Sequence, residues 1–414
     1  MSASPRNDLP LELLAWVETT TSGRVVDAVQ HIAGASRSAW SIDVAGPSDR
    51  GARGLFLLRD KGTGGGSHRD AAVLRALAPT SVPVPEVVGA SEEMASLLLE
   101  RLPGRSDFPP EDAPDEVDPV ARHLMEHTGE LHALDVARLD IPHLAIPRRA
   151  EDCARGSLAQ ACAAATALGP AADPFFSFAL DWLEANVPGH VDSYALVHSD
   201  MGPGNFLFEN GRVTGIIDWE VAHFGDPMED LAAIAVRDMA TPIGPLEVRF
   251  DEYETSTRTA VDLNRVRYYR ALVLVRNSLM IGLGLANPPK GYDIAEMTMY
   301  QTLLVRAAAL ALCENLGIDR PSVASAFAEG AVGDPLESER RDAARLLGLS
   351  HSQRNALRDA GSIANAVRSA MDRRTTSQDE LARYFSRRMH RLAKRHESLL
   401  GALYERLPQP LARP

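Results

Sequence analysis

An Asn-Gly pair at positions 210–211, between two short apolar runs, constrains this chain more than any other feature. Such a pair between apolar runs is the strongest short-range signal for a β-hairpin with a two-residue turn. Counting outward from the turn, Glu209 pairs with Arg212 and Asn205 pairs with Ile216. The sequence therefore predicts a tight hairpin whose strands leave polar residues at their open end.

Three polar side chains are predicted to meet at that open end. Asp218 lies two residues beyond Ile216, so it shares a face with Asn205, with about 7–8 Å between the backbones. Asp200 precedes them on a loop broken by glycine and proline, where a side chain is presented rather than buried. Phosphoryl transfer needs a carboxylate that orients a hydroxyl, and an amide and a second carboxylate that hold Mg²⁺. The alternative is that all three are solvated hairpin residues.

Linked motifs lie on both sides of the hairpin turn in a fixed order. The pieces are His198-Ser199-Asp200, Asn205, Ile217-Asp218-Trp219-Glu220 and Gly225-Asp226-Pro227-Met228-Glu229-Asp230. This order resembles the aminoglycoside phosphotransferase / choline kinase group of small-molecule kinases, which share the protein-kinase-like fold. The group has Gly where this chain has Ser199, and its acidic and amide positions are all kept. With residues 266–269, the motifs look similar to those of kinase domains attached to acyl-CoA-dehydrogenase-like proteins.

The resemblance implies transfer of a γ-phosphoryl group from ATP or GTP to a hydroxyl of a small molecule. Asp200 is expected to orient that hydroxyl, and Asn205 and Asp218 are expected to hold Mg²⁺. The acceptor could be a metabolite, a hydroxyacyl compound or an aminoglycoside-like antibiotic. A second interpretation is a nucleotide-binding pseudokinase or scaffold that acts through its C-terminal helices.

The remaining motif residues have supporting positions in the resembling group. His198 is expected behind the catalytic loop, and Asp226 and Asp230 are expected to support that loop. Ordinary loop chemistry and helix capping are the alternatives for the two aspartates. Trp219 and Glu220 are candidates for contact with the substrate. For the Trp219 indole, the favoured interpretation is packing as a wall of the site and not stacking on the substrate.

The first hundred residues contain the expected nucleotide-binding elements. A short helix is predicted over residues 25–31, followed by strand, turn and strand over residues 34–44. In the resembling group a Gly/Ser loop here covers the nucleotide phosphates with backbone N–H groups. Gly34, Ser36 and Ser38 are the candidates, and a plain hairpin turn is the alternative. The chain has no Gly-x-x-x-x-Gly-Lys-Ser/Thr motif, which disfavours a P-loop NTPase.

Residues 54–60 are predicted to form an apolar strand that ends in a cation. Protein kinases place a lysine in this strand to bind the α- and β-phosphates. Arg59 takes that place here, and a guanidinium can hold phosphate oxygens through two N–H groups. Lys61 is the rival, but it lies just past the strand. Asp70 stands where the group has Glu and is the expected partner of Arg59, with a helix N-terminal carboxylate as the alternative.

A second apolar strand over residues 96–99 leads to Glu100 and Leu102. In the resembling group the backbone that leaves this strand hydrogen-bonds the adenine. Both residues are therefore candidates for nucleotide binding, and their side chains do not distinguish ATP from GTP.

The predicted fold is α+β, two-lobed and protein-kinase-like. Residues 1–104 are expected to form the small lobe, and residues 105–330 a helical large lobe with the catalytic loop and metal site. Residues 331–414 are rich in arginine and are expected to form a helical C-terminal extension. Its apolar positions suit a small bundle or an arm packed on a partner, so it is a candidate contact for a protein partner or a second copy.

Composition argues against several classes of function. A net charge of −13 disfavours nucleic-acid binding, because no basic surplus is available to neutralise phosphates. Three cysteines without ligand spacing indicate no disulfide framework and fit a reducing cytoplasm. The polar first residues do not resemble a signal peptide. The most apolar run, residues 271–286, contains Arg276 and Asn277, which favours a core helix over a membrane span.

Overall fold

The computed structural model describes residues 9–31, 37–46, 52–61, 66–109, 113–169, 174–288 and 294–317, and a few positions between 341 and 349. The chain divides into two compact units, residues 1–292 and 293–414. The first unit contains the predicted small lobe and residues 105–292 of the predicted large lobe, whereas residues 293–330 fall in the second unit. Gly34, Ser36 and nearly all of the predicted C-terminal extension lie outside the described residues.

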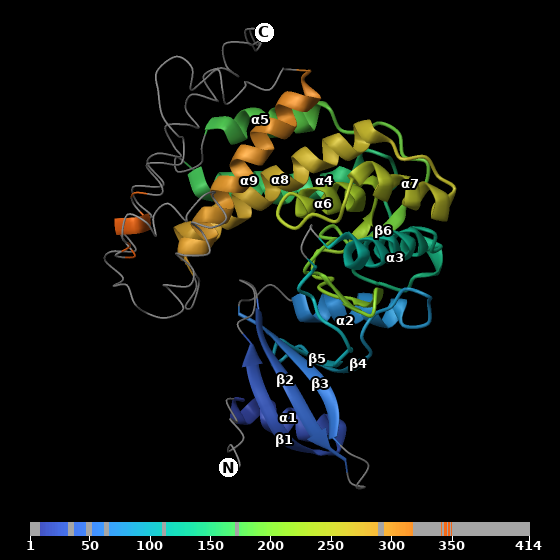
Figure 1. Ribbon diagram of the computed structural model, residues 1–414, viewed down its shortest axis with the longest axis vertical. Coiled ribbons are helices and arrows are strands. Elements are labelled where there is room, and N and C mark those ends of the chain that lie inside the picture. Colours follow the sequence, from blue (N-terminus) through green and yellow to red (C-terminus); the bar gives the residue numbers. More distant parts are fainter. Residues whose placement is uncertain are drawn as a thin grey trace. The chain divides into compact units, whose positions relative to one another are not determined.

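The small lobe is an antiparallel sheet with two helices (Figure 1). Its elements are α1 (Leu11–Thr21), β1 (Arg24–His31), β2 (Arg37–Ala45), β3 (Ala52–Asp60), α2 (Gly66–Leu77), β4 (Val87–Ser91) and β5 (Ser96–Glu100). The five strands lie in the order β1-β2-β3-β5-β4. Leu13 and Val17 of α1 are buried against Ile42, Leu55 and Leu57 of the sheet. Helix α1 therefore covers one face of the strands that lead to the catalytic region.

The helix predicted over residues 25–31 is wrong, because these residues form strand β1. They pair with β2 from Arg24 opposite Ala45 to His31 opposite Ala39. Val25 and Ala28 are buried in the cluster under α1, so packing onto the neighbouring strand overrides the short helical pattern. Ser38, predicted within a turn, lies in β2 opposite Arg59.

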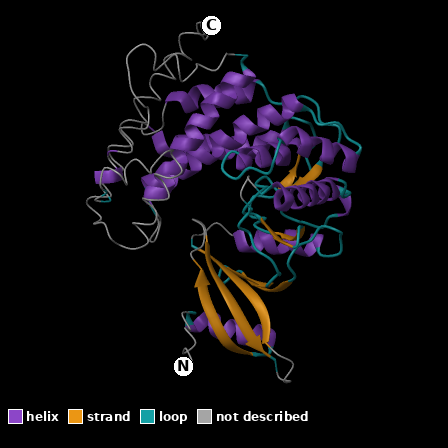
Figure 2. Ribbon diagram, in the orientation of Figure 1, coloured by secondary structure: helices purple, strands orange, loops and turns teal. Residues whose placement is uncertain are grey.

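The large lobe is mainly helical, with a few short strands (Figure 2). The helices are α3 (Pro114–His132), the 3₁₀ turn η1 (Val136–Arg138), α4 (Asp152–Leu168), α5 (Pro174–Ala185), α6 (Met228–Asp238), α7 (Leu246–Thr257) and α8 (Leu263–Ala286). The strands are β6 (Ala195–Val197), β7 (Phe206–Glu209), β8 (Arg212–Ile216) and β9 (His223–Gly225). In the second unit, helix α9 spans Ile294–Asn315.

Helix α8 is the central helix of the large lobe and packs against α4, α5 and α6. Its length and composition would suffice to cross a membrane, but 56% of its most apolar stretch is buried inside the fold. Arg276, in the middle of this helix, is buried and makes hydrogen bonds to two serines. The run over residues 271–286 is thus part of a core helix, and it carries a buried cation to the back of the catalytic loop.

The segment that joins the lobes is attached directly to the predicted hairpin. The backbones of Arg105 and Phe208 exchange two hydrogen bonds of 3.0 Å, and the Thr214 hydroxyl donates to the Pro103 carbonyl at 2.6 Å. Gly215 leaves room for this contact, because a Cβ there would meet the Leu102 side chain at 2.0 Å. Residues 102–105 are therefore held against the hairpin by both backbone and side-chain contacts.

Candidate active site

The predicted hairpin is present as β7 and β8, with one correction to its register. Asn210 and Gly211 both have positive φ, as a two-residue hairpin turn of this kind requires, and Glu209 pairs with Arg212. Ile216, however, pairs with Phe206 and not with Asn205, because a bulge shifts the strands by one residue beyond Phe208. The carbonyl of Asn205 accepts from the N–H of the next residue, Ile217, at 2.9 Å.

The corrected register still brings Asn205 next to the start of the Ile-Asp-Trp-Glu motif, one residue from Asp218. The Asn205 amide nitrogen donates to the carbonyl of Asp200 at 2.8 Å and to its carboxylate at 2.9 Å. Among the described residues no group donates to the Asn205 amide oxygen, so this oxygen is available to a ligand.

Asp218 has φ of 66° and a side chain that is 42% exposed. A left-handed backbone at a residue other than glycine costs free energy and is found most often where function requires it. The described part of the chain has no group of three or more His, Cys, Asp or Glu that could enclose a metal ion. An Asn oxygen and one carboxylate form the open oxygen-ligand set that suits Mg²⁺, which keeps several waters or phosphate oxygens.

Asp200 is fixed by Arg237, a residue that the sequence analysis missed. Nε of Arg237 donates to one carboxylate oxygen at 2.9 Å, and an Nη donates to the other at 2.5 Å. The second Nη donates to the carbonyl of Pro203 at 2.7 Å, which fastens the loop that contains Asp200. The Asp200 side chain remains 31% exposed, so its oxygens can still reach a solute.

The only sequence signal for Arg237 is a basic residue in the last turn of α6, 37 positions after Asp200. Gly202 and Gly204 fit against the Arg237 side chain, and a Cβ at Gly202 would meet it at 2.9 Å. The glycines of the loop thus have a packing reason as well as a conformational one.

Asp230 lies behind the loop, fully buried, and accepts three hydrogen bonds. The backbone N–H groups of His198 and Ser199 donate to it at 2.9 and 2.7 Å, and His132 of α3 contacts it at 3.0 Å. His132 also bonds to the Tyr253 hydroxyl at 2.8 Å. The predicted role of Asp230 as a brace requires contacts of this kind.

His198 is a packed residue with both ring nitrogens in use. Nε2 lies 2.9 Å from the carbonyl of Ile217, and the N–H of Asp200 donates to Nδ1 at 3.3 Å, which favours a neutral ring protonated at Nε2. The ring packs 4.6 Å from that of Trp219, whose indole N–H donates to the Ile216 carbonyl. Trp219 is 1% exposed, so its candidate position on the substrate side is wrong and the indole is a buried wall.

Ser199, the departure from the Gly of the related motif, joins a buried charged network. Its φ of 67° explains why Gly suits this position. The Ser199 hydroxyl donates to Glu229 at 2.7 Å and accepts from Arg276 at 3.1 Å. Burial by itself would raise the pKa of Glu229, but His223 and Arg276 lower it below its usual range. Glu229 is therefore a buried carboxylate ion that depends on these three neighbours.

Asp226 is also fully buried, at the start of α6. It accepts from the N–H of Met228 at 3.0 Å and lies 3.4 Å from the Arg265 guanidinium. Burial raises the pKa of Asp226 to about 6, although both of these neighbours act in the opposite direction. Its geometry is that of a residue that caps α6 and ties it to α8.

The expected ion pair between Arg59 and Asp70 is wrong. Asp70 is buried and accepts from Arg37 of β2 at 2.7 Å, whereas Arg59 lies 2.8 Å from Glu12 of α1. Burial raises the pKa of Asp70 to about 7, against the effect of Arg37. Glu220 is also close to Arg37, at 3.3 Å, and its substrate-side role stays a prediction.

The exit from β5 has the open backbone that the nucleotide-binding interpretation needs. The N–H of Glu100 is used by Glu86 and that of Arg101 by Gly54. Within the described part of the chain, the backbone N–H and carbonyl of Leu102 have no hydrogen-bond partner. The adenine-binding role of Leu102 stays a prediction.

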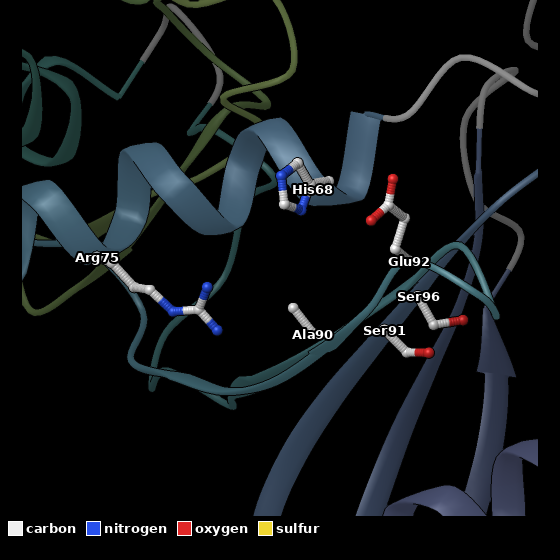
Figure 3. Close-up of a pocket in the computed structure, with 6 residues that line it drawn as sticks. All are labelled: His68, Arg75, Ala90, Ser91, Glu92 and Ser96. Carbon is white, nitrogen blue, oxygen red and sulfur yellow. The ribbon is translucent and has the colours of Figure 1, made fainter. Parts of the chain in front are cut away.

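A pocket of about 230 Å³ lies elsewhere, between α2 and the β4–β5 turn (Figure 3). His68 and Arg75 approach it from the helix, Ala90, Ser91 and Ser96 line it from the strands, and Glu92 lines it from the turn between them. It contains none of the predicted site residues. The candidate catalytic groups thus lie outside this pocket.

Comparison with known proteins identifies the family. The phosphotransferase enzyme family (APH) matches residues 49–268, more than half of the chain. The chain belongs to this family. The predicted two-lobed α+β fold is confirmed, because the chain aligns with a macrolide 2'-phosphotransferase type I at a TM-score of 0.54 and 17% identity, over 71% of this chain and 98% of that one.

Two curated relatives and one further structure illustrate the range of the family. Hygromycin-B 4-O-kinase of Escherichia coli is 29% identical over 51% of this chain and 62% of its own length. The probable acyl-CoA dehydrogenase IBR3 of Arabidopsis thaliana is 31% identical over 40% of this chain and 22% of its own length. A mutant aminoglycoside phosphotransferase, solved with ADP and hygromycin B, aligns at a TM-score of 0.53 and 23% identity, over 72% of this chain and 99% of that one. The matches span less than two thirds of either curated relative.

Proposed function

We propose that this phosphotransferase family member is a Mg²⁺-dependent small-molecule kinase that transfers a γ-phosphoryl group from ATP or GTP to a hydroxyl. The observation that carries the proposal is the arrangement around Asp200. Its partly exposed carboxylate is held by Arg237 and by the amide of Asn205, and Asn205 is adjacent to the segment that carries Asp218.

Asp200 is the group that orients the acceptor. Its Oδ2 accepts from both Arg237 and Asn205, whereas Oδ1 accepts only from Nε of Arg237 and keeps a lone pair that can accept from a hydroxyl. The carboxylate would take the hydroxyl proton as the acceptor oxygen bonds to the γ-phosphorus. The bond between that phosphorus and the bridging oxygen of the β-phosphate would break, and the nucleoside diphosphate would leave. Because Arg237 and Asn205 fix the carboxylate in advance, little reorganisation is needed when the acceptor arrives.

Asn205 and Asp218 would hold Mg²⁺, through the amide oxygen and one carboxylate oxygen. Bound there, the ion would neutralise charge on the β- and γ-phosphates. The orientation of Asn205 supports this role, because its NH₂ group is occupied by Asp200 and its oxygen is left to the ligand. The unpaired backbone of Leu102 supports a purine at the other end of the nucleotide.

The acceptor is proposed to be a small hydroxylated molecule, and two classes follow from the relatives. One relative is named as a hygromycin-B kinase, and others are acyl-CoA-dehydrogenase-like proteins. A panel of aminoglycosides, including hygromycin B, and of hydroxyacyl compounds therefore covers both classes. The site residues are shared by the two classes and do not select between them.

The test is paired. Calorimetry measures the affinity for MgATP and MgGTP, and mass spectrometry follows product formation with the acceptor panel. Asp200→Asn should keep nucleotide affinity and lose turnover by roughly 10²–10⁴-fold, the usual size of acid–base assistance. Asp251→Asn, at an exposed aspartate of α7, is the matched control and should behave as wild type.

A scaffold that only binds nucleotide gives a different result. It predicts MgATP binding without product from any acceptor, and no difference between wild type and Asp200→Asn. Equal turnover in wild type and Asp200→Asn would remove Asp200 from the mechanism and contradict the proposal.

A further inference from the structure

Arg37 is the most enclosed cation near the candidate nucleotide site. It is the first residue of β2, is 5% exposed, and directly opposes Asp60 of β3. Its guanidinium lies between four carboxylates from three parts of the chain. They are Asp60 at 3.2 Å, Asp70 at 2.7 Å, Glu220 at 3.3 Å and Asp218 at 3.6 Å.

These four contacts are of two kinds. Asp60 and Asp70, from the small lobe, accept hydrogen bonds from Nε and from one Nη. Asp218 and Glu220, from the large lobe, are close enough for ion pairs but accept no hydrogen bond from Arg37. The guanidinium is thus anchored on one side and directed toward the candidate metal ligand on the other.

One donor nitrogen of this group makes an ion pair with Glu220, at 3.3 Å, but no hydrogen bond. The second Nη of Arg37 is buried and makes no hydrogen bond to the described residues. A buried donor without a partner costs free energy, so native structures supply one from water, protein or ligand. The space beside this Nη is kept by Gly66, where a Cβ would lie 2.7 Å from the nitrogen.

Arg59 cannot take the same position, because of strand alternation. Leu55 and Leu57 are buried under α1, and Arg59 has the same parity along β3, which places it on the α1 face with Glu12. Asp60 has the opposite parity and shares its face with Arg37, the residue it opposes in the sheet.

We propose that Arg37 of β2, and not a cation of β3, contacts the phosphates of the bound nucleotide. Asp60 and Asp70 position the guanidinium, and the Nη that makes no hydrogen bond donates to a phosphate oxygen of the bound nucleotide. Two N–H groups on one planar group can hold such an oxygen while the other contacts persist. The inference rests on the proposed nucleotide-dependent function and names a specific residue for it.

The test uses calorimetry with MgATP and with adenosine, which has no phosphate. Arg37→Gln should weaken MgATP binding by about 10- to 100-fold, the effect of losing a charge-assisted hydrogen bond, and leave adenosine affinity unchanged. Arg53→Gln, at an exposed arginine of β3 that pairs with Glu86, is the matched control. Arg59→Gln should weaken MgATP binding less than Arg37→Gln does.

Arg37→Gln leaves Asp70 without its buried partner, and the variant could fail to fold. The double variant Arg37→Gln/Asp70→Asn removes both charges and should bind MgATP as weakly as the single variant is expected to. Gly66→Ala offers a third route, since the added methyl displaces the guanidinium without removing any charge. It should lower MgATP affinity and spare adenosine.

The outcomes separate the inference from the proposed function. If wild type binds MgATP and these variants bind it equally well, the inference is overturned and the kinase proposal stands. Equal losses for MgATP and adenosine would make Arg37 a structural residue and overturn the inference too. A wild type that binds adenosine and MgATP with the same affinity, or binds neither, would contradict both.

Discussion

Replacing Ser199 with Gly restores the residue of the related motif, and we expect it to destabilise this protein. Two effects oppose each other. Gly relieves the left-handed backbone at φ 67°, which costs a residue with a side chain about 1–2 kcal/mol. Gly also adds about 0.4–1 kcal/mol of backbone freedom to the unfolded chain, which cancels much of that relief.

Loss of the Ser199 hydroxyl decides whether the substitution stabilises or destabilises the protein. The hydroxyl donates to Glu229 at 2.7 Å inside a fully buried network, and hydrogen bonds to charged groups contribute about 1.5–3 kcal/mol. Without it, Glu229 keeps His223 and Arg276 but loses its closest donor. The net loss of stability for Ser199→Gly is therefore about 1.5 kcal/mol. Ser199→Ala should lower the free energy of unfolding by about 1 kcal/mol more, because a residue with a methyl side chain still pays for the left-handed backbone.

The same substitution at Ser22 is the control. Ser22 ends α1 with φ 52°, is exposed, and its hydroxyl bonds to none of the described residues. Ser22→Gly should be neutral or stabilise by up to about 1 kcal/mol, as Gly is preferred after a helix end. Urea denaturation followed by tryptophan fluorescence measures all three variants. If Ser199→Gly raised the free energy of unfolding as Ser22→Gly does, the buried network would be worth less than the strain, and the reasoning would be refuted.

Three further outcomes are expected. Asp218→Ala should abolish Mg²⁺-dependent binding of ATP with the fold intact, and unchanged MgATP affinity in calorimetry would exclude Asp218 as a ligand. Arg237→Gln should reduce kcat at least about tenfold with little change in nucleotide affinity, because the substitution frees the Asp200 carboxylate. A kcat equal to that of wild type would mean that Asn205 alone suffices to hold this carboxylate. Burial raises the pKa of Asp226 from 3.8 to about 6, so the stability this group contributes is present below about pH 4 and lost as pH rises through about 6. Between these limits wild type should lose about 3 kcal/mol relative to Asp226→Asn, and parallel pH dependence in urea denaturation would contradict this.

The catalytic hairpin could be predicted from sequence because its information is local. Asn210 and Gly211 define the turn, and Asp200, Asn205 and Asp218 lie within a few residues of the strands it joins. The family and the two-lobed fold were predicted from the same stretch and are confirmed. The one-residue error in register comes from a bulge at Thr214, whose hydroxyl donates to the distant Pro103 carbonyl, a contact that no local pattern encodes.

The residues that sequence reasoning missed act over long separations. Arg237 reaches Asp200 across 37 positions, and Arg276 reaches Ser199 across 77. Each lies on an α-helix, where one arginine among several has no pattern that marks it as buried or functional. What selects Arg237 and Arg276 is the packing of α6 and α8 behind the catalytic loop.

The wrong ion pair between Arg59 and Asp70 shows what the alternation of side chains along a strand can and cannot predict. Alternation alone puts Arg59 on the face of Leu55 and Leu57, and that much is visible in the sequence. Which face meets the large lobe depends on where α1 packs, and α1 covers the face that Arg59 shares. The cation that meets Asp70 must therefore come from the opposite face, where β2 presents Arg37. Because Arg59 of β3 points toward α1, a cation on the opposite face of the sheet must come from a neighbouring strand, and Arg37 of β2 is that cation.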